Sequence, residues 1–174
     1  MNVFECVKSL SSIRSYIDKE IPDEILTNII EAGRLAPSAH NDQPWQFIII
    51  RDRNILNKLK NYCKSGGFVS QVNLAVVVIT DPSSKWHEID STRAVQNMVL
   101  TAWSYKIGSC WIGRLDKVGL HDLLNIPKSL NILTVLPFGY FNDNLISKYK
   151  YRKDQKEIFH YENFGTRNRN QSSE

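Results

Sequence analysis

The turn at residues 36–46, with the sequence APSAHNDQPWQ, combines a rigid backbone with side chains that can bind a ligand. Pro37 and Pro44 fix their own φ and keep the residues before them out of the helical region, so the turn has few conformations. Ser38, Asn41 and Gln43 offer hydroxyl and amide groups for hydrogen bonds. A stiff polar loop between a helix and a buried strand suits a flat heterocycle with many polar atoms. The alternative is an ordinary connection in which these residues only form the turn.

A second set of polar groups, at opposite ends of the sequence, suits an anion. Ser12 and Arg14 lie in a turn predicted after the first helix. Lys150 and Arg152 alternate, so on an extended segment they would point to the same side. Arginine binds a phosphate through two parallel hydrogen bonds, and lysine adds a point charge. Taken alone, Lys150 and Arg152 also fit a solvated basic surface, which remains an alternative.

The standard motifs of phosphate-loop, covalent and metal chemistry are missing from the sequence. It has no GxGxxG after a strand, no GxxxxGK[ST] loop, and no serine or cysteine in a nucleophile elbow. The three cysteines and four histidines are scattered, so neither a disulfide framework nor a metal centre is predicted. We therefore assign no catalytic side chain and expect a bound cofactor to supply the chemistry.

The composition is typical of one folded domain: 174 residues, 42% hydrophobic and 23% charged, with a net charge of +4. We predict a single domain over residues 1–165 and a flexible polar tail over residues 166–174. No apolar run approaches the roughly 20 residues that cross a bilayer, and the N-terminus lacks the layout of a signal peptide. We therefore predict a cytoplasmic protein with no membrane partner.

The elements that must position these residues are helices interleaved with strands. The continuous apolar run at 74–80 predicts a strand covered on both faces, and the pattern at 89–105 predicts a long central helix. Further strands are predicted at 45–51, 109–112 and 132–140, and further helices at 3–10, 22–35, 54–63 and 115–124. This order predicts an α+β domain with a mixed central sheet flanked by helices.

Six stretches resemble, in this order, the FMN-dependent nitroreductase family, and the resemblance extends to about residue 165. They are 12–16 (SIRSY), 36–45 (APSAHNDQPW), 94–97 (AVQN), 108–113 (GSCWIG), 136–140 (LPFGY) and 151–153 (YRK). The APSxxNxQPW pattern is the specific one. The resemblance implies a three-layer fold, a bound FMN, and a homodimer in which the C-terminal arm is exchanged.

The resemblance also implies which residues contact FMN. In that family the first turn and the late lysine–arginine pair hold the phosphate, which here implies Ser11, Ser12, Arg14, Lys150 and Arg152. The polar turn reaches the ring and ribityl chain from the partner subunit, which implies Pro37, Ser38, Ala39 and Asn41. The GSCWIG segment lies near flavin N5, which implies Cys110, Trp111, Ile112 and Gly113. Leu10 departs from the family, because an arginine usually opens the phosphate motif there, so we expect FMN binding about ten- to a hundredfold weaker.

The implied function is an oxidoreductase that works by two-step, ping-pong hydride transfer. NAD(P)H would reduce the flavin and leave, and a small acceptor such as a nitroaromatic or a quinone would take its place. The alternatives are a flavin-binding protein that stores or senses FMN, and a specialised relative that acts on one substrate. A nucleic-acid binder using the basic residues 148–156 is a third reading, but the low total charge argues against it, so no nucleic-acid partner is predicted.

Overall fold

Strand β2, Leu74–Thr80, forms the centre of the fold, and every one of its residues is buried. In the computed structural model, which describes residues 1–146 and 149–167, β2 pairs with β1 (Trp45–Ile50) on one side and β4 (Asn131–Gly139) on the other. The short β3 (Gly108–Ser109) completes the order β1-β2-β4-β3. The unbroken apolar run of β2 is what a strand covered on both faces requires.

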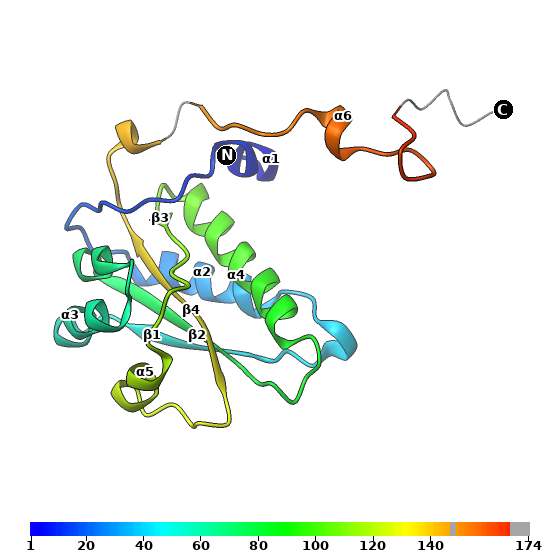
Figure 1. Cartoon of the computed structure of the whole chain (residues 1–174). Helices are drawn as coiled ribbons and strands as arrows, with labels where there is room; N and C mark the ends of the chain where they lie inside the picture. The colour runs from blue at the N-terminus through cyan, green and yellow to red at the C-terminus, as the bar shows by residue number, and fades with distance from the viewer. Residues whose placement is uncertain (147–148, 168–174) are drawn as a thin grey trace.

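Alternate side chains of β2 enter two separate cores, because successive residues of a strand point to opposite faces. Ala75, Val77 and Ile79 share a core with α3 (Arg53–Tyr62), the 3-10 helix η2 (Gly67–Gln71) and α5 (Lys117–Leu123). Leu74, Val76 and Val78 share the other core with α2 (Asp23–Arg34) and α4 (His87–Ser104). The sheet therefore lies between two helical layers (Figure 1), and the predicted three-layer α+β fold is confirmed.

The four strands of the sheet pair antiparallel. Within the described residues, parallel pairing is limited to one bridge between Ser12 and Ser109, which places the N-terminal segment at the edge of β3. The sheet itself is therefore antiparallel, where a mixed sheet was predicted, and this isolated bridge is the parallel pairing beside it. A parallel neighbour needs a long connection, and here the two partners come from distant parts of the chain.

Most predicted boundaries shift by one or two residues in the structure, and two of the differences bear on the argument. Pro22 precedes α2 as its N-cap instead of occupying the first helical position. The strand predicted over 109–112 ends at Ser109, and Ile112 rejoins the sheet through an isolated bridge to Val135. The chain leaves the sheet between these points, and Trp111 is 42% exposed.

The N-terminal helix and the C-terminal arm lie next to each other (Figure 1). Helix α1 (Val3–Ser9) packs at the end of α4, where Trp103 Nε1–H donates to Ser9 Oγ at 2.8 Å. After β4 and the short η3 (Asp143–Leu145), the arm passes α1 and includes α6 (Gln155–Ile158). Residues 147–148 and 168–174, which include Lys148 and most of the predicted tail, lie outside the described part. None of the described helices combines the length and apolar character needed to span a bilayer.

Candidate functional site

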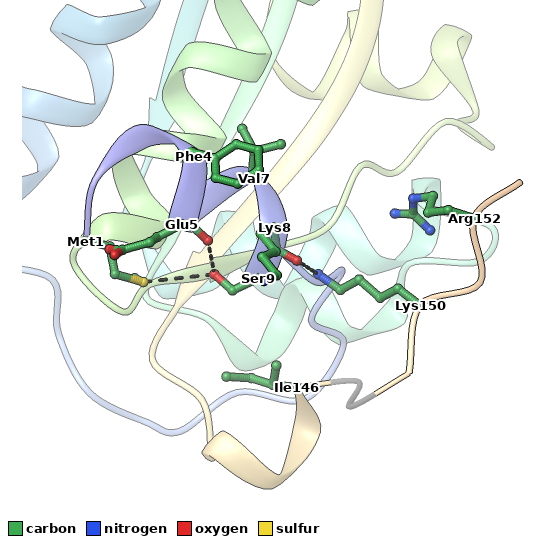
Figure 2. A pocket seen from close by; sticks show the side chains of 9 residues that line it. All are labelled: Met1, Phe4, Glu5, Val7, Lys8, Ser9, Ile146, Lys150 and Arg152. Carbon is green, nitrogen blue, oxygen red and sulfur yellow. Dashed lines mark hydrogen bonds between the residues drawn. The ribbon is translucent and has the colours of Figure 1, made fainter. Parts of the chain in front are cut away.

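Lys150 and Arg152 reach from the C-terminal arm toward α1 and line an open groove of about 830 Å³ (Figure 2). Lys150 Nζ donates to the carbonyl oxygen of Lys8 at 3.1 Å and also to that of Leu10. These carbonyls belong to the C-terminal end of α1, where the helix dipole favours a cation. The fold thus brings a cation of the late pair to the N-terminal segment, although the two are 140 residues apart in the sequence.

The electrostatics of this groove favour an anion. Burial lowers the pKa of Lys150, and the positive charge of Arg152 lowers it further. Glu5 also lines the groove, but its carboxylate accepts the Asn2 N–H at 2.9 Å as part of the cap of α1. A phosphate bound here would offset the repulsion between the two cations and accept hydrogen bonds from both. The groove therefore presents two cations beside an otherwise largely apolar lining that includes Met1, Phe4, Val7 and Ile146.

The first turn runs directly beside the segment that carries Cys110. Ser12 bridges to Ser109, and both Ser12 and Arg14 are exposed. Burial raises the pKa of the Cys110 thiol, while the Arg14 charge and a hydrogen bond with Ser12 oppose that rise. Ser12 and Arg14 therefore lie beside the beginning of the 110–113 segment and are not among the residues that line the groove of Lys150 and Arg152.

Three of the predicted site residues are turned inward. Ser11 is buried, and its hydroxyl donates to a carbonyl of α1 at 3.3 Å. Cys110 and Ile112 are also buried, and Ile112 belongs to the core between the sheet and α3. Trp111 and Gly113 are the exposed members of the GSCWIG segment. A ligand on this surface would therefore meet the indole ring and the glycine backbone.

The polar turn has an unusual backbone. It includes η1 (Ala39–Asn41), and the φ values of His40, Asn41 and Gln43 are 52°, 59° and 48°. Non-glycine residues rarely adopt this left-handed conformation. The Gln43 N–H donates to Ser38 Oγ at 3.0 Å, which closes the turn. This hydrogen bond is one physical cause of the predicted rigidity of the turn.

Asp90, which the sequence did not single out, anchors this turn. Its side chain is 1% exposed, and Oδ2 accepts the Ala39 N–H at 2.9 Å. Oδ1 pairs with Arg93 Nη1 at 3.1 Å one helical turn later. A carboxylate near the start of a helix is common, so the sequence carried no signal for this contact.

The two halves of the predicted site lie at opposite ends of α4 (Figure 1). Asp90, in the first turn of α4, holds the polar turn, and Trp103, in the last turn, bonds to α1. At a rise of 1.5 Å per residue, these two residues are about 20 Å apart along the helix axis. Within one chain, the polar turn with Pro37, Ser38, Ala39 and Asn41 therefore lies far from the groove of Lys150 and Arg152.

Tyr16 is a further residue near the site that the sequence analysis left without a role. Its hydroxyl donates to the Ile13 carbonyl at 2.6 Å, and its N–H donates to Gln71 Oε1 at 3.2 Å. Its ring centroid lies 6.4 Å from that of Phe68, and burial raises the pKa of Tyr16. Tyr16 thus fixes the first turn against η2. The sequence could have indicated Tyr16 through its position in the SIRSY stretch.

Comparison with known proteins decides the family. The model of the nitroreductase family matches residues 7–82 and 79–140. The chain belongs to the nitroreductase family. A provisionally named NADH dehydrogenase/NAD(P)H nitroreductase of Archaeoglobus fulgidus is 37% identical over 152 residues, covering 80% of this chain and 87% of the relative.

Two further members of the comparison are similar to this chain over most of its length. The structure of an FMN-dependent nitroreductase from Clostridium difficile R20291 matches with a TM-score of 0.82 and 27% identity, covering 92% of this chain and 99% of the other. An iodotyrosine deiodinase of Thermotoga neapolitana is 21% identical over 166 residues, covering 81% of this chain and 89% of that protein.

Leu10 stands where the resemblance to the nitroreductase family leads us to expect an arginine. Its side chain packs in an apolar cluster with Trp103 and Phe141, and its carbonyl accepts the hydrogen bond from Lys150. Leu10 thus supports α1 through packing and contributes no charge to the groove.

In the described part of the chain, no cluster of three or more histidine, cysteine or acidic side chains could hold a metal ion.

Proposed function

We propose that the chain is an FMN-dependent oxidoreductase that uses NAD(P)H to reduce small organic acceptors such as nitroaromatics or quinones. The observation that carries this proposal is the path from the cation-lined groove, past the Ser12–Ser109 bridge, to the exposed Trp111 and Gly113. From Ser109 to Gly113 this path spans at most about 13 Å of extended chain. A phosphate at one end and a flat ring at the other match the shape of FMN, and the FMN-dependent relative supports the choice.

Each part of the site has a task under this proposal. The groove cations and the Ser12 hydroxyl hold the phosphate, and Trp111 and Gly113 border the open face where the nicotinamide and the acceptor bind in turn. Bound FMN supplies the chemistry, because its ring accepts a hydride and passes it on. Asn41 of the partner subunit would offer its side-chain amide as a hydrogen-bond donor that stabilises negative charge on the bound group. Water supplies the protons.

We also propose a homodimer with exchanged C-terminal arms, in which the polar turn of one chain completes the site of the other. The separation of the two half-sites along α4 supports this arrangement. Exposed apolar side chains on α1 and on the arm support it too: Val3, Phe4, Ile158, Phe159 and Phe164, of which Phe164 is 92% exposed. Burying such surface against a second copy is favourable by about 25 cal/mol per Å².

The test starts with the absorption spectrum of the protein reconstituted with FMN. NADH or NADPH should bleach the flavin absorbance without oxygen, and a nitroaromatic or a quinone should restore it. Iodotyrosine belongs in the acceptor panel because one relative is named an iodotyrosine deiodinase. Unchanged flavin absorbance under a large excess of both nucleotides would show the reductase proposal to be wrong. Bleaching without steady-state NAD(P)H oxidation would favour a storage or sensing role.

A further inference from the structure

A pair of exposed cations, Lys64 and Arg114, lies beside the GSCWIG segment and has no role in the site described above. The residues after α3 and before α5 form a short antiparallel ribbon, with a bridge between Cys63 and Leu115. Next to this bridge, the Lys64 N–H donates to the Arg114 carbonyl at 2.9 Å. Residues directly opposite each other in such a ribbon project from the same face. The backbones of Lys64 and Arg114 are therefore direct neighbours.

The two charges of this pair are not neutralised within the described residues. Like charges at opposed positions repel, and neither side chain forms a salt bridge there. The nearby carboxylate of Asp116 is engaged, because its Oδ1 accepts the Gly119 N–H at 3.2 Å as the cap of α5. Lysine and arginine together suit a phosphate oxygen. The pair is therefore open to an anionic ligand from solution.

The backbone beneath the pair is fixed. Gly66 packs so closely on Ile112 that a Cβ at position 66 would lie 2.5 Å from Ile112 Cδ1. The Ile112 N–H donates to the Val135 carbonyl at 3.1 Å, and Thr134 Oγ1 donates to the Ile112 carbonyl at 3.1 Å. Both strands of the ribbon are thus tied to the core. The backbone that carries the two cations is therefore held in place relative to Gly113.

We propose that Lys64 and Arg114 bind the pyrophosphate of the nicotinamide dinucleotide while its nicotinamide lies beside Gly113, an inference that rests on the proposed function. Arg114 follows Gly113 directly, and in the dinucleotide one ribose separates the nicotinamide from the pyrophosphate. The 2′-phosphate that distinguishes NADPH lies beyond the pyrophosphate, on the second ribose. The pair should therefore bind NADH and NADPH alike.

The test uses the variants Lys64→Gln, Arg114→Gln and their combination in the FMN-loaded protein. Lys58→Gln, which removes an exposed cation from α3, is the matched control. Anaerobic flavin reduction is measured against the concentration of NADH, NADPH and 1-benzyl-1,4-dihydronicotinamide, a hydride donor without phosphates. In the double variant the apparent Kd of both dinucleotides should rise about tenfold, and the benzyl donor should be unaffected. Calorimetric titration with ADP-ribose, which keeps the pyrophosphate of the dinucleotide and lacks only the nicotinamide, should show the same loss.

Several outcomes would overturn this assignment. Unchanged Kd values would show that the pair does not contact the dinucleotide, and a loss confined to NADPH would place the 2′-phosphate at the pair instead. An equal loss with the benzyl donor would mean that the flavin site itself had been disturbed. If none of the three donors reduces the wild-type flavin, the proposed function fails, and the ADP-ribose titration still decides whether the pair binds a pyrophosphate.

Discussion

Two variants that each damage one half of the FMN site should restore binding when they form mixed dimers. One variant carries Arg14→Ala and Arg152→Ala in the phosphate half, and the other carries Ser38→Ala and Asn41→Ala in the polar turn. The halves are about 20 Å apart along α4, so neither variant can rescue its own site. Losing two charge-assisted hydrogen bonds of about 1.5–3 kcal/mol each should weaken FMN binding to the first variant by at least a hundredfold. The turn variant should lose less, because its groups are neutral.

The size of the rescue follows from symmetry. Equal amounts of two chains that pair at random give about half mixed dimers, and each mixed dimer has one intact site, so about a quarter of all sites should recover wild-type affinity. Different affinity tags isolate the mixed dimers, and quenching of FMN fluorescence counts the tight sites. Each variant mixed with wild type is the control. Mixed dimers without tight sites would refute a site shared between two chains.

Three further predictions test individual contacts. Asp90→Asn should weaken FMN binding, measured by fluorescence titration, because Ala39 loses a carboxylate acceptor in a bond of about 1.5–3 kcal/mol. Burial raises the pKa of the Cys63 thiol to about 11 in the folded protein. Because the thiol of the unfolded chain ionises at lower pH, the free energy of unfolding should fall by at most about 3 kcal/mol as the pH rises from about 9 to 11. Urea denaturation at a series of pH values measures this change. Cys63→Ala should lack that loss, and a flat wild-type profile would contradict it. Gly66→Ala should lower the free energy of unfolding by about 1–3 kcal/mol, because the new Cβ crowds Ile112. Gly67→Ala is the control, because its new Cβ would meet nothing within 4 Å. Thermal unfolding of this control should match wild type.

The layers of the fold could be predicted because burial leaves a pattern in each element. The apolar run of β2 required two covered faces, and α4 carried a broad apolar face, so both were predictable from local sequence. The strand order and the Ser12–Ser109 bridge were not, because they join segments that are distant in the chain. The end of β3 at Ser109 was missed because Trp111 looks like a strand residue until its exposure is known.

The sequence predicted the candidate site only where the type of a residue indicates its chemistry. Lys150 was expected near the first turn, and it does bond to the Leu10 carbonyl. Asp90 could not be predicted, because its role depends on where the polar turn lies relative to α4. Lys64 and Arg114 meet only through the register of a two-residue ribbon, which no periodicity in the sequence encodes.

The left-handed residues of the polar turn have a consequence for affinity. A backbone in this region costs about 1–3 kcal/mol per residue and persists only where surrounding contacts impose it. Here the Gln43 N–H bond to Ser38 and the Ala39 N–H bond to Asp90 hold the turn that contains His40, Asn41 and Gln43. A surface that is already ordered gives up little entropy when a ligand arrives. The affinity of this turn for a ligand therefore depends in part on Ser38 and Asp90, which order the turn before the ligand binds. A substitution at Asp90 would weaken the binding of a ligand that does not contact Asp90.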